Sequence, residues 1–213
     1  MTSLLNAILV IVLVMNLFAL AASRIRALIR IVAVQGALLG AIPLLVPQHV
    51  ALPAVLMVVA AVAIKGVVIP LIMMRALRDA QIKREVGPLI GRLPSVILGA
   101  AAILFAVLFA DQLPLADQHE GVLLVPASIA TVLVGFILLT TRVKAITQIV
   151  GYLVLENGIY IFGTLLIEAL PLVVELGVLL DLFVGIFVIC IIVNHINQAF
   201  SSLDTRQLVS LKE

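Results

Sequence analysis

Three ionisable residues, Lys65, Glu156 and Asp181, lie in the middle of apolar runs that are long enough to cross a membrane. A charge at the centre of a bilayer costs roughly 2.5–3.5 kcal/mol even on lenient insertion scales, so such a residue usually has a partner, a water-filled cavity or a function. Carboxylates that take up and release protons beside a lysine could carry charge through the membrane. The alternatives are a lysine that reaches the membrane surface and carboxylates that form static hydrogen bonds between helices.

Two further polar residues are candidates for the same proton or ion pathway. Gln35 lies within the second apolar run and can hydrogen-bond and hold water, although it cannot carry a proton as a carboxylate does. His195 lies near the predicted cytoplasmic end of the last run and could pass protons to the cell interior. A structural role for Gln35 and an ordinary interfacial position for His195 are the alternatives.

The composition indicates a polytopic integral membrane protein. Of the 213 residues, 64% are hydrophobic and only 11% are charged, whereas soluble domains carry about 25% charged residues. The chain has no phosphate-binding glycine loop, no Cys or His spacing suited to zinc or iron–sulfur clusters and no nucleophile elbow. We therefore expect a chain that is not an enzyme by itself, that holds no cofactor and that contacts membrane lipids rather than nucleic acid.

Seven apolar runs are long enough to cross a hydrocarbon layer of about 30 Å as helices. Membrane-spanning sheets are excluded, because an open sheet would leave backbone groups unpaired and a barrel would need alternating polar and apolar residues. The fold class predicted is therefore all-α integral membrane. The expected spans are 3–23, 27–46, 51–75, 92–110, 121–141, 145–167 and 172–197.

The distribution of positive charge predicts the orientation of these spans. Lys and Arg occur in the first, third and fifth links and in the C-terminal tail, whereas the second, fourth and sixth links contain none. Because positive residues accumulate on the cytoplasmic side, this alternation predicts an N-terminus outside and a C-terminus in the cytoplasm.

An internal repeat divides the seven spans. The segment Arg24–Ala27 resembles Arg142–Ala145, and the same offset pairs Gly40 with Gly158. In this register Glu156 matches a position one turn beyond Gln35. Two three-helix units with one linking helix between them form a parallel repeat, written 3+1+3. The expected parts are a first unit at 1–77, a basic loop with the linking helix at 78–120, a second unit at 121–198 and a tail at 199–213.

A basic turn, an apolar helix with a mid-membrane acid and a third helix with another ionisable residue resemble the K-type subunit of respiratory complex I and the C-type subunit of Mrp antiporters. With two such units, the chain is similar to the hydrogenase-4 component E (HyfE-like) family. The resemblance places Glu156 near the first buried glutamate of the family and Asp181 near its second acid. In the first unit Gln35 replaces the first acid, and Lys65 occupies the region of the second.

This resemblance implies a non-catalytic membrane subunit of a complex I-like nickel–iron hydrogenase or formate hydrogenlyase-type complex, in the cytoplasmic membrane of a bacterium or archaeon. Antiporter-like membrane subunits would be its partners. The buried charges would belong to an intramembrane pathway that couples electron transfer to proton or sodium movement. A stand-alone secondary transporter and a purely structural spacer are the alternative functions.

Overall fold

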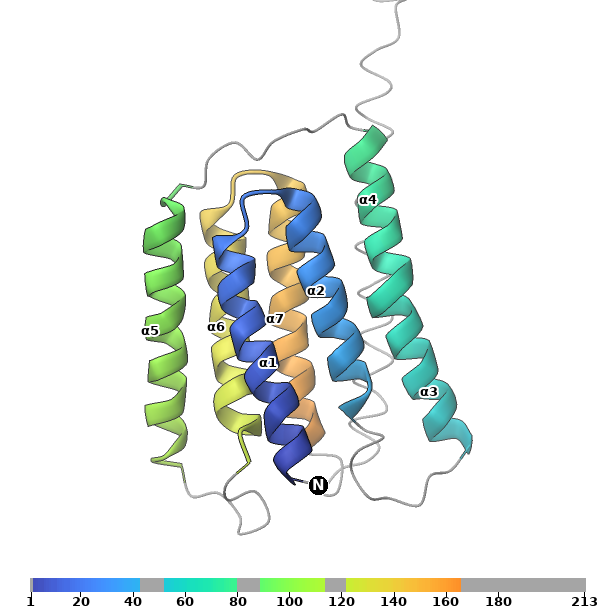
Figure 1. The fold of residues 1–213 in the computed structure, drawn as a ribbon, viewed down its shortest axis with the longest axis vertical. Helices are drawn as coiled ribbons and strands as arrows, with labels where there is room; N and C mark the ends of the chain where they lie inside the picture. Colours follow the sequence, from blue (N-terminus) through green and yellow to red (C-terminus); the bar gives the residue numbers. More distant parts are fainter. Residues whose placement is uncertain (1, 43–51, 80–88, 114–121, 166–213) are drawn as a thin grey trace, which may run out of the picture.

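The computed structural model describes residues 2–42, 52–79, 89–113 and 122–165, and every regular element in these ranges is a helix (Figure 1). The expected span at 172–197, with Asp181 and His195, lies outside the described residues. The elements are α1 (Thr2–Ala21), α2 (Ile25–Gly40), α3 (Leu52–Ala63), the π-helix η2 (Ile64–Val68), α4 (Ile69–Asp79), α5 (Arg92–Ala110), α6 (Leu124–Thr141) and α7 (Ala145–Leu165).

Five helical segments are long and apolar enough to cross a membrane, so the chain is a multi-pass α-helical membrane protein. They match five of the seven expected spans. The described part of a sixth, α2, has only 16 residues and is shorter than a full span. The five segments are Ser3–Ala21, Val58–Arg78, Arg92–Ala110, Leu124–Thr141 and Ile146–Leu165.

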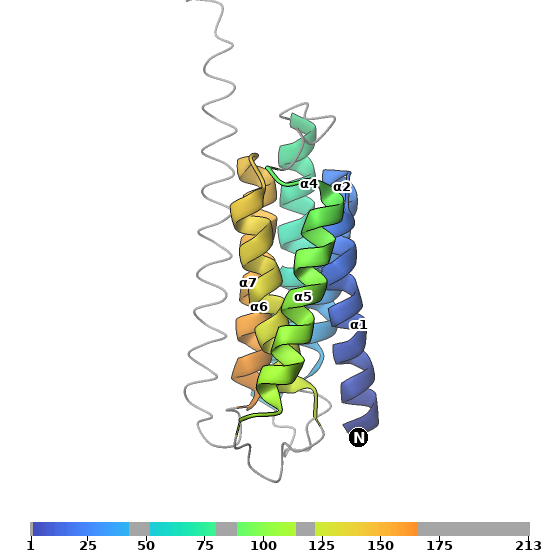
Figure 2. The same ribbon diagram turned by 90° about the vertical axis from the view of Figure 1, so that its left-hand side faces the viewer.

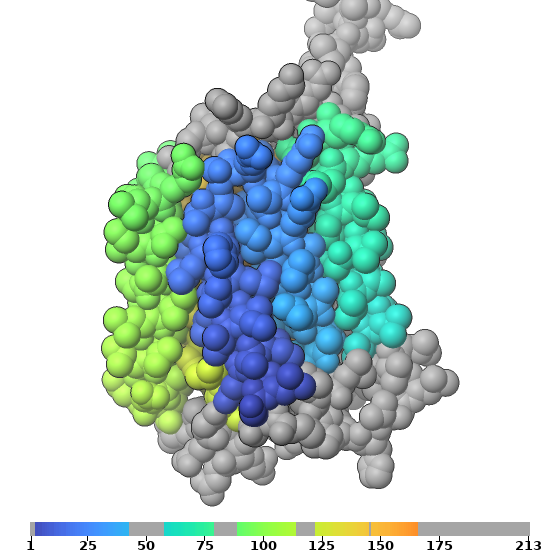
Figure 3. Space-filling view, in the orientation of Figure 1, coloured from blue at the N-terminus to red at the C-terminus, as the bar shows by residue number. Residues whose placement is uncertain are grey.

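The helices form one bundle with their axes roughly side by side (Figures 1 and 2). α1 and α2 pack against α6 and α7, α5 covers α1 and α6 on one side, and the continuous helix α3–η2–α4 packs against α2 on the other. Figure 3 shows α1 and α2 on one face between α5 and α3–α4. Large apolar side chains such as Phe18, Leu71 and Phe105 are exposed on the outer faces, as contact with lipid requires.

α6 and α7 pack backbone to backbone through three glycines. A Cβ atom added to Gly151 would lie 2.6 Å from the backbone nitrogen of Leu139, and one added to Gly158 would lie 2.6 Å from that of Val132. A Cβ atom on Gly135 would collide with the backbone of Leu155. Small residues allow this close approach, which stabilises helix pairs in lipid by van der Waals contact.

The α1–α2 and α6–α7 connections are the same kind of turn. The carbonyl of Arg24 accepts hydrogen bonds from the backbone N–H groups of Ala27 (3.0 Å) and Leu28 (3.1 Å), and the carbonyl of Lys144 accepts the equivalent bonds at 2.9 and 3.0 Å. The backbone therefore matches Arg24 with Lys144, whereas the sequence similarity matches Arg24 with Arg142. The two registers differ by two residues at this turn.

Basic residues gather at one end of the bundle. The two turns, the end of α4 and the start of α5 all lie at this end (Figure 1). The backbone N–H of Leu89 donates to the carbonyl of Thr141 at 2.9 Å, which fixes the approach to α5 beside the α6–α7 turn. The basic residues of these segments are Arg24, Arg26, Arg78, Arg92, Arg142 and Lys144. The structure thus brings together basic segments that are far apart in the sequence.

Candidate intramembrane ion site

Lys65 and Glu156 meet inside the bundle. The Lys65 Nζ atom of η2 lies 3.5 Å from the Glu156 Oε1 atom of α7, and the two side chains are 11% and 7% exposed. The lysine therefore does not extend to the membrane surface, as the snorkelling alternative required. Two opposite charges at this distance interact strongly where the local dielectric is low.

The π-helix η2 positions Lys65. Pro70 has no backbone N–H, and its ring would collide with the carbonyl of Gly66 in a regular α-helix. The chain relieves this conflict with a wider turn, in which the N–H of Ile69 donates to the carbonyl of Ile64, five residues earlier. Such π-segments are rare and often occur at functional sites. Pro70, five residues after Lys65, was the sequence signal for this feature, which the sequence analysis missed.

Two glycines let α2 and η2 come close enough for Lys65 to reach α7. A Cβ atom on Gly36 would lie 3.1 Å from the Lys65 Cβ atom, and one on Gly66 would lie 3.1 Å from the Ala37 Cβ atom. In the register of the two turns, Gly36 is the counterpart of Glu156. The first helix pair thus has no side chain at the position where the second pair has a carboxylate.

Tyr160 also contacts the lysine, although nothing in the sequence singled it out. The Lys65 Nζ atom lies 4.8 Å from the centroid of the Tyr160 ring, which is within the range of a cation–π interaction. Tyr160 follows Glu156 by four residues on α7, so the two side chains lie on the same face of the helix. The ammonium is therefore shared between a carboxylate and an aromatic ring.

A small cavity adjoins the pair. Its volume is about 20 Å³, enough for one water molecule. Lys65, Glu156 and Asn157 provide its polar lining, and the other described lining residues, from α2, α4 and α7, have apolar side chains or are glycine. A water here would have polar partners and would lie next to a carboxylate that can accept a proton.

Gln35 belongs to a separate buried network that joins three helices. Its Nε2 atom donates to the Asn16 Oδ1 atom at 2.9 Å, and the Asn16 Nδ2 atom donates to the Thr131 Oγ1 atom, also at 2.9 Å. The Thr131 hydroxyl donates to the carbonyl of Ala127 at 2.7 Å. Gln35 is not among the described residues that line the cavity, so this geometry favours its structural role. Asn16 and Thr131 escaped the sequence analysis because single polar residues in apolar helices are common.

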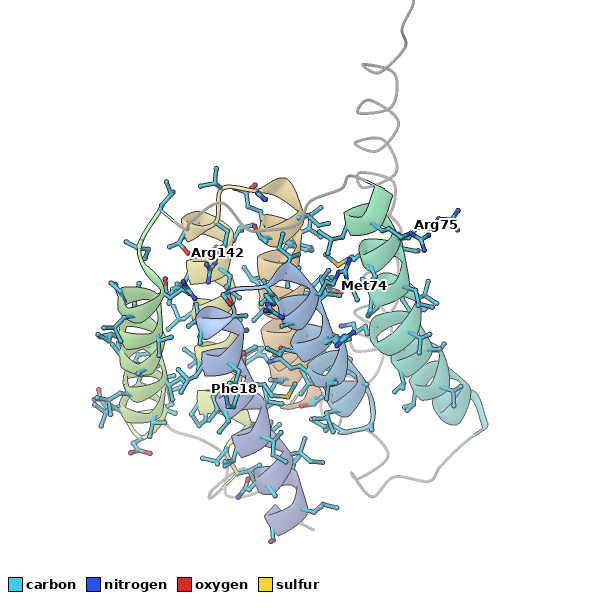
Figure 4. The ribbon with its side chains drawn as sticks, turned by 45° about the horizontal axis from the view of Figure 1, so that its top comes forward. Phe18, Met74, Arg75 and Arg142 are labelled. Carbon is cyan, nitrogen blue, oxygen red and sulfur yellow. The ribbon has the colours of Figure 1, made fainter. Side chains whose placement is uncertain are left out.

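Arg142 is buried rather than exposed at its turn (1% exposed). Its Nη2 atom donates to the carbonyl of Leu20 at 2.8 Å, at the C-terminal end of α1, where a positive charge is stabilising. Figure 4 shows Arg142 beside α1 near the α6–α7 turn, whereas Arg75 points away from the bundle. The sequence had indicated only that Arg142 marks a cytoplasmic link.

Among the described residues, no group of three or more His, Cys, Asp and Glu side chains is placed to hold a metal ion. Within the described ranges, Lys65 and Glu156 are oppositely charged groups that the fold brings together inside the bundle. A carboxylate beside a water-sized cavity is a group that can accept or release a proton.

The chain is similar to proteins of two descriptions. It is 35% identical over 89% of its length to the uncharacterised protein Rv0085 of Mycobacterium tuberculosis, 87% of which is covered. It is 27% identical over 70% of its length to hydrogenase-4 component E of Escherichia coli K12 and of Shigella flexneri, with 68% of each covered. No family model and no solved structure matches the chain. By its identity and coverage, the chain belongs to the same family as Rv0085.

Proposed function

We propose that this chain is a non-catalytic membrane subunit of a complex I-like hydrogenase or formate hydrogenlyase-type complex. In this complex it forms part of the charged pathway that couples electron transfer to proton or sodium movement. The observation that carries the proposal is the buried Lys65–Glu156 pair, with 3.5 Å between Nζ and Oε1, beside a water-sized cavity. The similarity to hydrogenase-4 component E supports the assignment to such a complex.

The pair is suited to coupling because a buried charge responds strongly to other charges nearby. When the charge of a neighbouring antiporter-like subunit changes, the balance between Glu156 with and without its proton changes as well. A water in the adjoining cavity would be the immediate donor or acceptor of that proton. In this proposal Asp181 and His195 continue the pathway, and Gln35 supports it from the adjacent polar network.

The proposal includes a 3+1+3 arrangement, with three-helix units at 1–77 and 121–198, a connecting part at 78–120 and a cytoplasmic tail at 199–213. The basic end of the bundle faces the cytoplasm of a bacterium or archaeon, and the N-terminus lies outside. The gathering of basic residues at one end of the bundle supports this orientation.

The test is to introduce Glu156→Gln and Asp181→Asn, singly and together, into the assembled complex. Each change keeps the size of the side chain and removes its ability to ionise. Redox-driven ion uptake is then measured in sealed membrane vesicles, and assembly is measured by native electrophoresis. We expect electron transfer and assembly to persist while ion uptake falls at least tenfold. Asp111→Asn, an equivalent change at an exposed position after α5, is the matched control.

Normal ion uptake by an assembled complex with both changes would contradict the pathway role and favour a structural spacer. Purification in detergent tests the complex itself. Copurification with a large antiporter-like subunit and an iron–sulfur peripheral arm is expected. A chain that purifies alone and is active in transport would instead identify a secondary transporter.

A further inference from the structure

We propose that Tyr160 is a positioning residue that provides a second binding place for the Lys65 ammonium when Glu156 takes up a proton. This inference rests on the proposed function, because it concerns how the same pair completes a protonation cycle. The structure holds Nζ 3.5 Å from Glu156 Oε1 and 4.8 Å from the centre of the Tyr160 ring. The ammonium thus lies where a small movement exchanges one partner for the other.

The geometry allows this exchange without movement of the backbone. Glu156 and Tyr160 lie one turn apart on the same face of α7. The side chain of Lys65 is a flexible four-carbon stem, so Nζ can move between the two partners while η2 stays in place. The distance of 3.5 Å to Oε1 exceeds the roughly 2.7–2.9 Å of a charge-assisted hydrogen bond. Glu156 therefore does not hold the ammonium in a tight contact that would have to be broken first.

The exchange solves a charge problem in the cycle. When Glu156 accepts a proton from a protonated water (hydronium) in the cavity, one O–H bond of the hydronium breaks, one O–H bond forms on the carboxylate and a neutral water remains. The carboxyl group is then neutral and attracts the Lys65 ammonium less strongly. Among the described residues that line the cavity, Lys65 and Glu156 are the only ionisable ones. The negative face of the Tyr160 ring stabilises the ammonium at this stage.

A simple packing role is the competing explanation for Tyr160. The ring is half-buried and contacts the apolar cluster around Leu9, Ile42 and Ile161. The chain has only two tyrosines, and the other, Tyr152, lies two turns earlier on α7 against a different apolar cluster. Changes at Tyr152 therefore control for the loss of an aromatic ring from this helix.

The first test measures the position of the ammonium directly, by nuclear magnetic resonance of the full chain with labelled lysines in lipid vesicles. Lys65→Arg identifies the Lys65 signal. Glu156→Gln, which imitates the protonated acid, is expected to shift the Lys65 ammonium protons to lower frequency by shielding from the ring. In Glu156→Gln/Tyr160→Leu this shift is lost, and in Glu156→Gln/Tyr160→Phe or Glu156→Gln/Tyr152→Leu it persists. Equal shifts with and without the ring at position 160 would overturn the proposal.

The second test measures ion uptake per electron in the assembled complex. Pentafluorophenylalanine at position 160 keeps the shape of a ring but inverts its quadrupole, so uptake should fall roughly tenfold, whereas Tyr160→Phe stays near the unmodified rate. Equal uptake with both rings would show that Tyr160 only packs. Failure of this inference is distinguishable from failure of the proposed function. Normal ion uptake in Glu156→Gln would contradict the proposed function. The resonance shift is measured in vesicles without the complex, so it tests the role of Tyr160 alone.

Discussion

The helix pairs α1–α2 and α6–α7 share the same turn but are held together in different ways. α6 and α7 approach backbone to backbone through Gly135, Gly151 and Gly158. α1 and α2 share buried apolar contacts and add polar ones, which include a hydrogen bond from Gln35 to Asn16 and bonds to α6 and its turn. The second pair therefore holds Glu156 on two closely packed helices. The first pair is fixed to the second by hydrogen bonds between residues far apart in the sequence.

The same contrast appears at the ion site. In the register of the turns, the second pair has Glu156 where the first has Gly36. The missing side chain at Gly36 leaves room for Lys65, since a Cβ atom there would lie 3.1 Å from that of the lysine. The site is thus built from both parts of the chain. The first provides Lys65 and, at Gly36, the room for it, and the second provides the carboxylate of Glu156. Neither half contains the site alone.

The strongest test of this shared site is Lys65→Met. The change leaves Glu156 in the bundle without its ammonium, so the free energy of unfolding should fall by about 3–5 kcal/mol. Denaturant titration in mixed micelles measures this loss. Lys65→Met/Glu156→Leu removes both charges and should recover most of the stability. A double variant as unstable as the single one would mean that the pair does not hold the halves together.

The tight packing of the second pair can be broken by one methyl group. Gly135→Ala places a Cβ atom against the backbone of Leu155, which cannot move aside as a side chain could. We expect a loss of about 3 kcal/mol, the upper range for an overpacked core, measured by the same titration. Gly163→Ala is the matched control, because nothing lies within 4 Å of a Cβ atom there. Equal effects at the two glycines would contradict the packing argument.

The turns themselves should respond unequally to the same change. Arg142→Met removes a buried charged donor from the carbonyl of Leu20 and should cost about 2 kcal/mol. Arg24→Met, at the exposed counterpart in the sequence register, should leave the unfolding midpoint unchanged. If both variants lose the same stability, the arginines act through membrane topology rather than through the α1 contact.

The smallest effect is expected in the polar network of the first pair. Gln35→Leu removes one hydrogen bond, that to Asn16, and bonds of this kind between membrane helices contribute about 0.6 kcal/mol on average. Thermal unfolding in the same micelles measures this loss of stability. Asn16→Leu is the variant for comparison, because it removes two hydrogen bonds and should cost more. A larger loss from Gln35→Leu than from Arg142→Met would reverse the order of importance proposed here.

Much of the helical fold follows from local sequence. The apolar run at 92–110 predicts the bounds of α5, because length and hydropathy alone define a lipid-facing helix. The contact between Lys65 and Glu156 could not be predicted in this way. It depends on how distant helices pack, which rests on single glycines and on the π-turn. Tyr160 and Arg142 were equally hidden, because their roles depend on what lies across the bundle.

The π-helix at Ile64–Val68 has a consequence for how sequences of this kind can change. A π-turn takes one residue more than an α-turn, so a single deletion within this segment would return it to a regular helix and leave the residues from Ile69 onward on their present faces. Met73 would stay buried, and Leu71 and Arg75 would stay exposed. The deletion would, however, restore the collision between the ring of Pro70 and the carbonyl four residues earlier. The length of this segment and its proline are therefore constrained together.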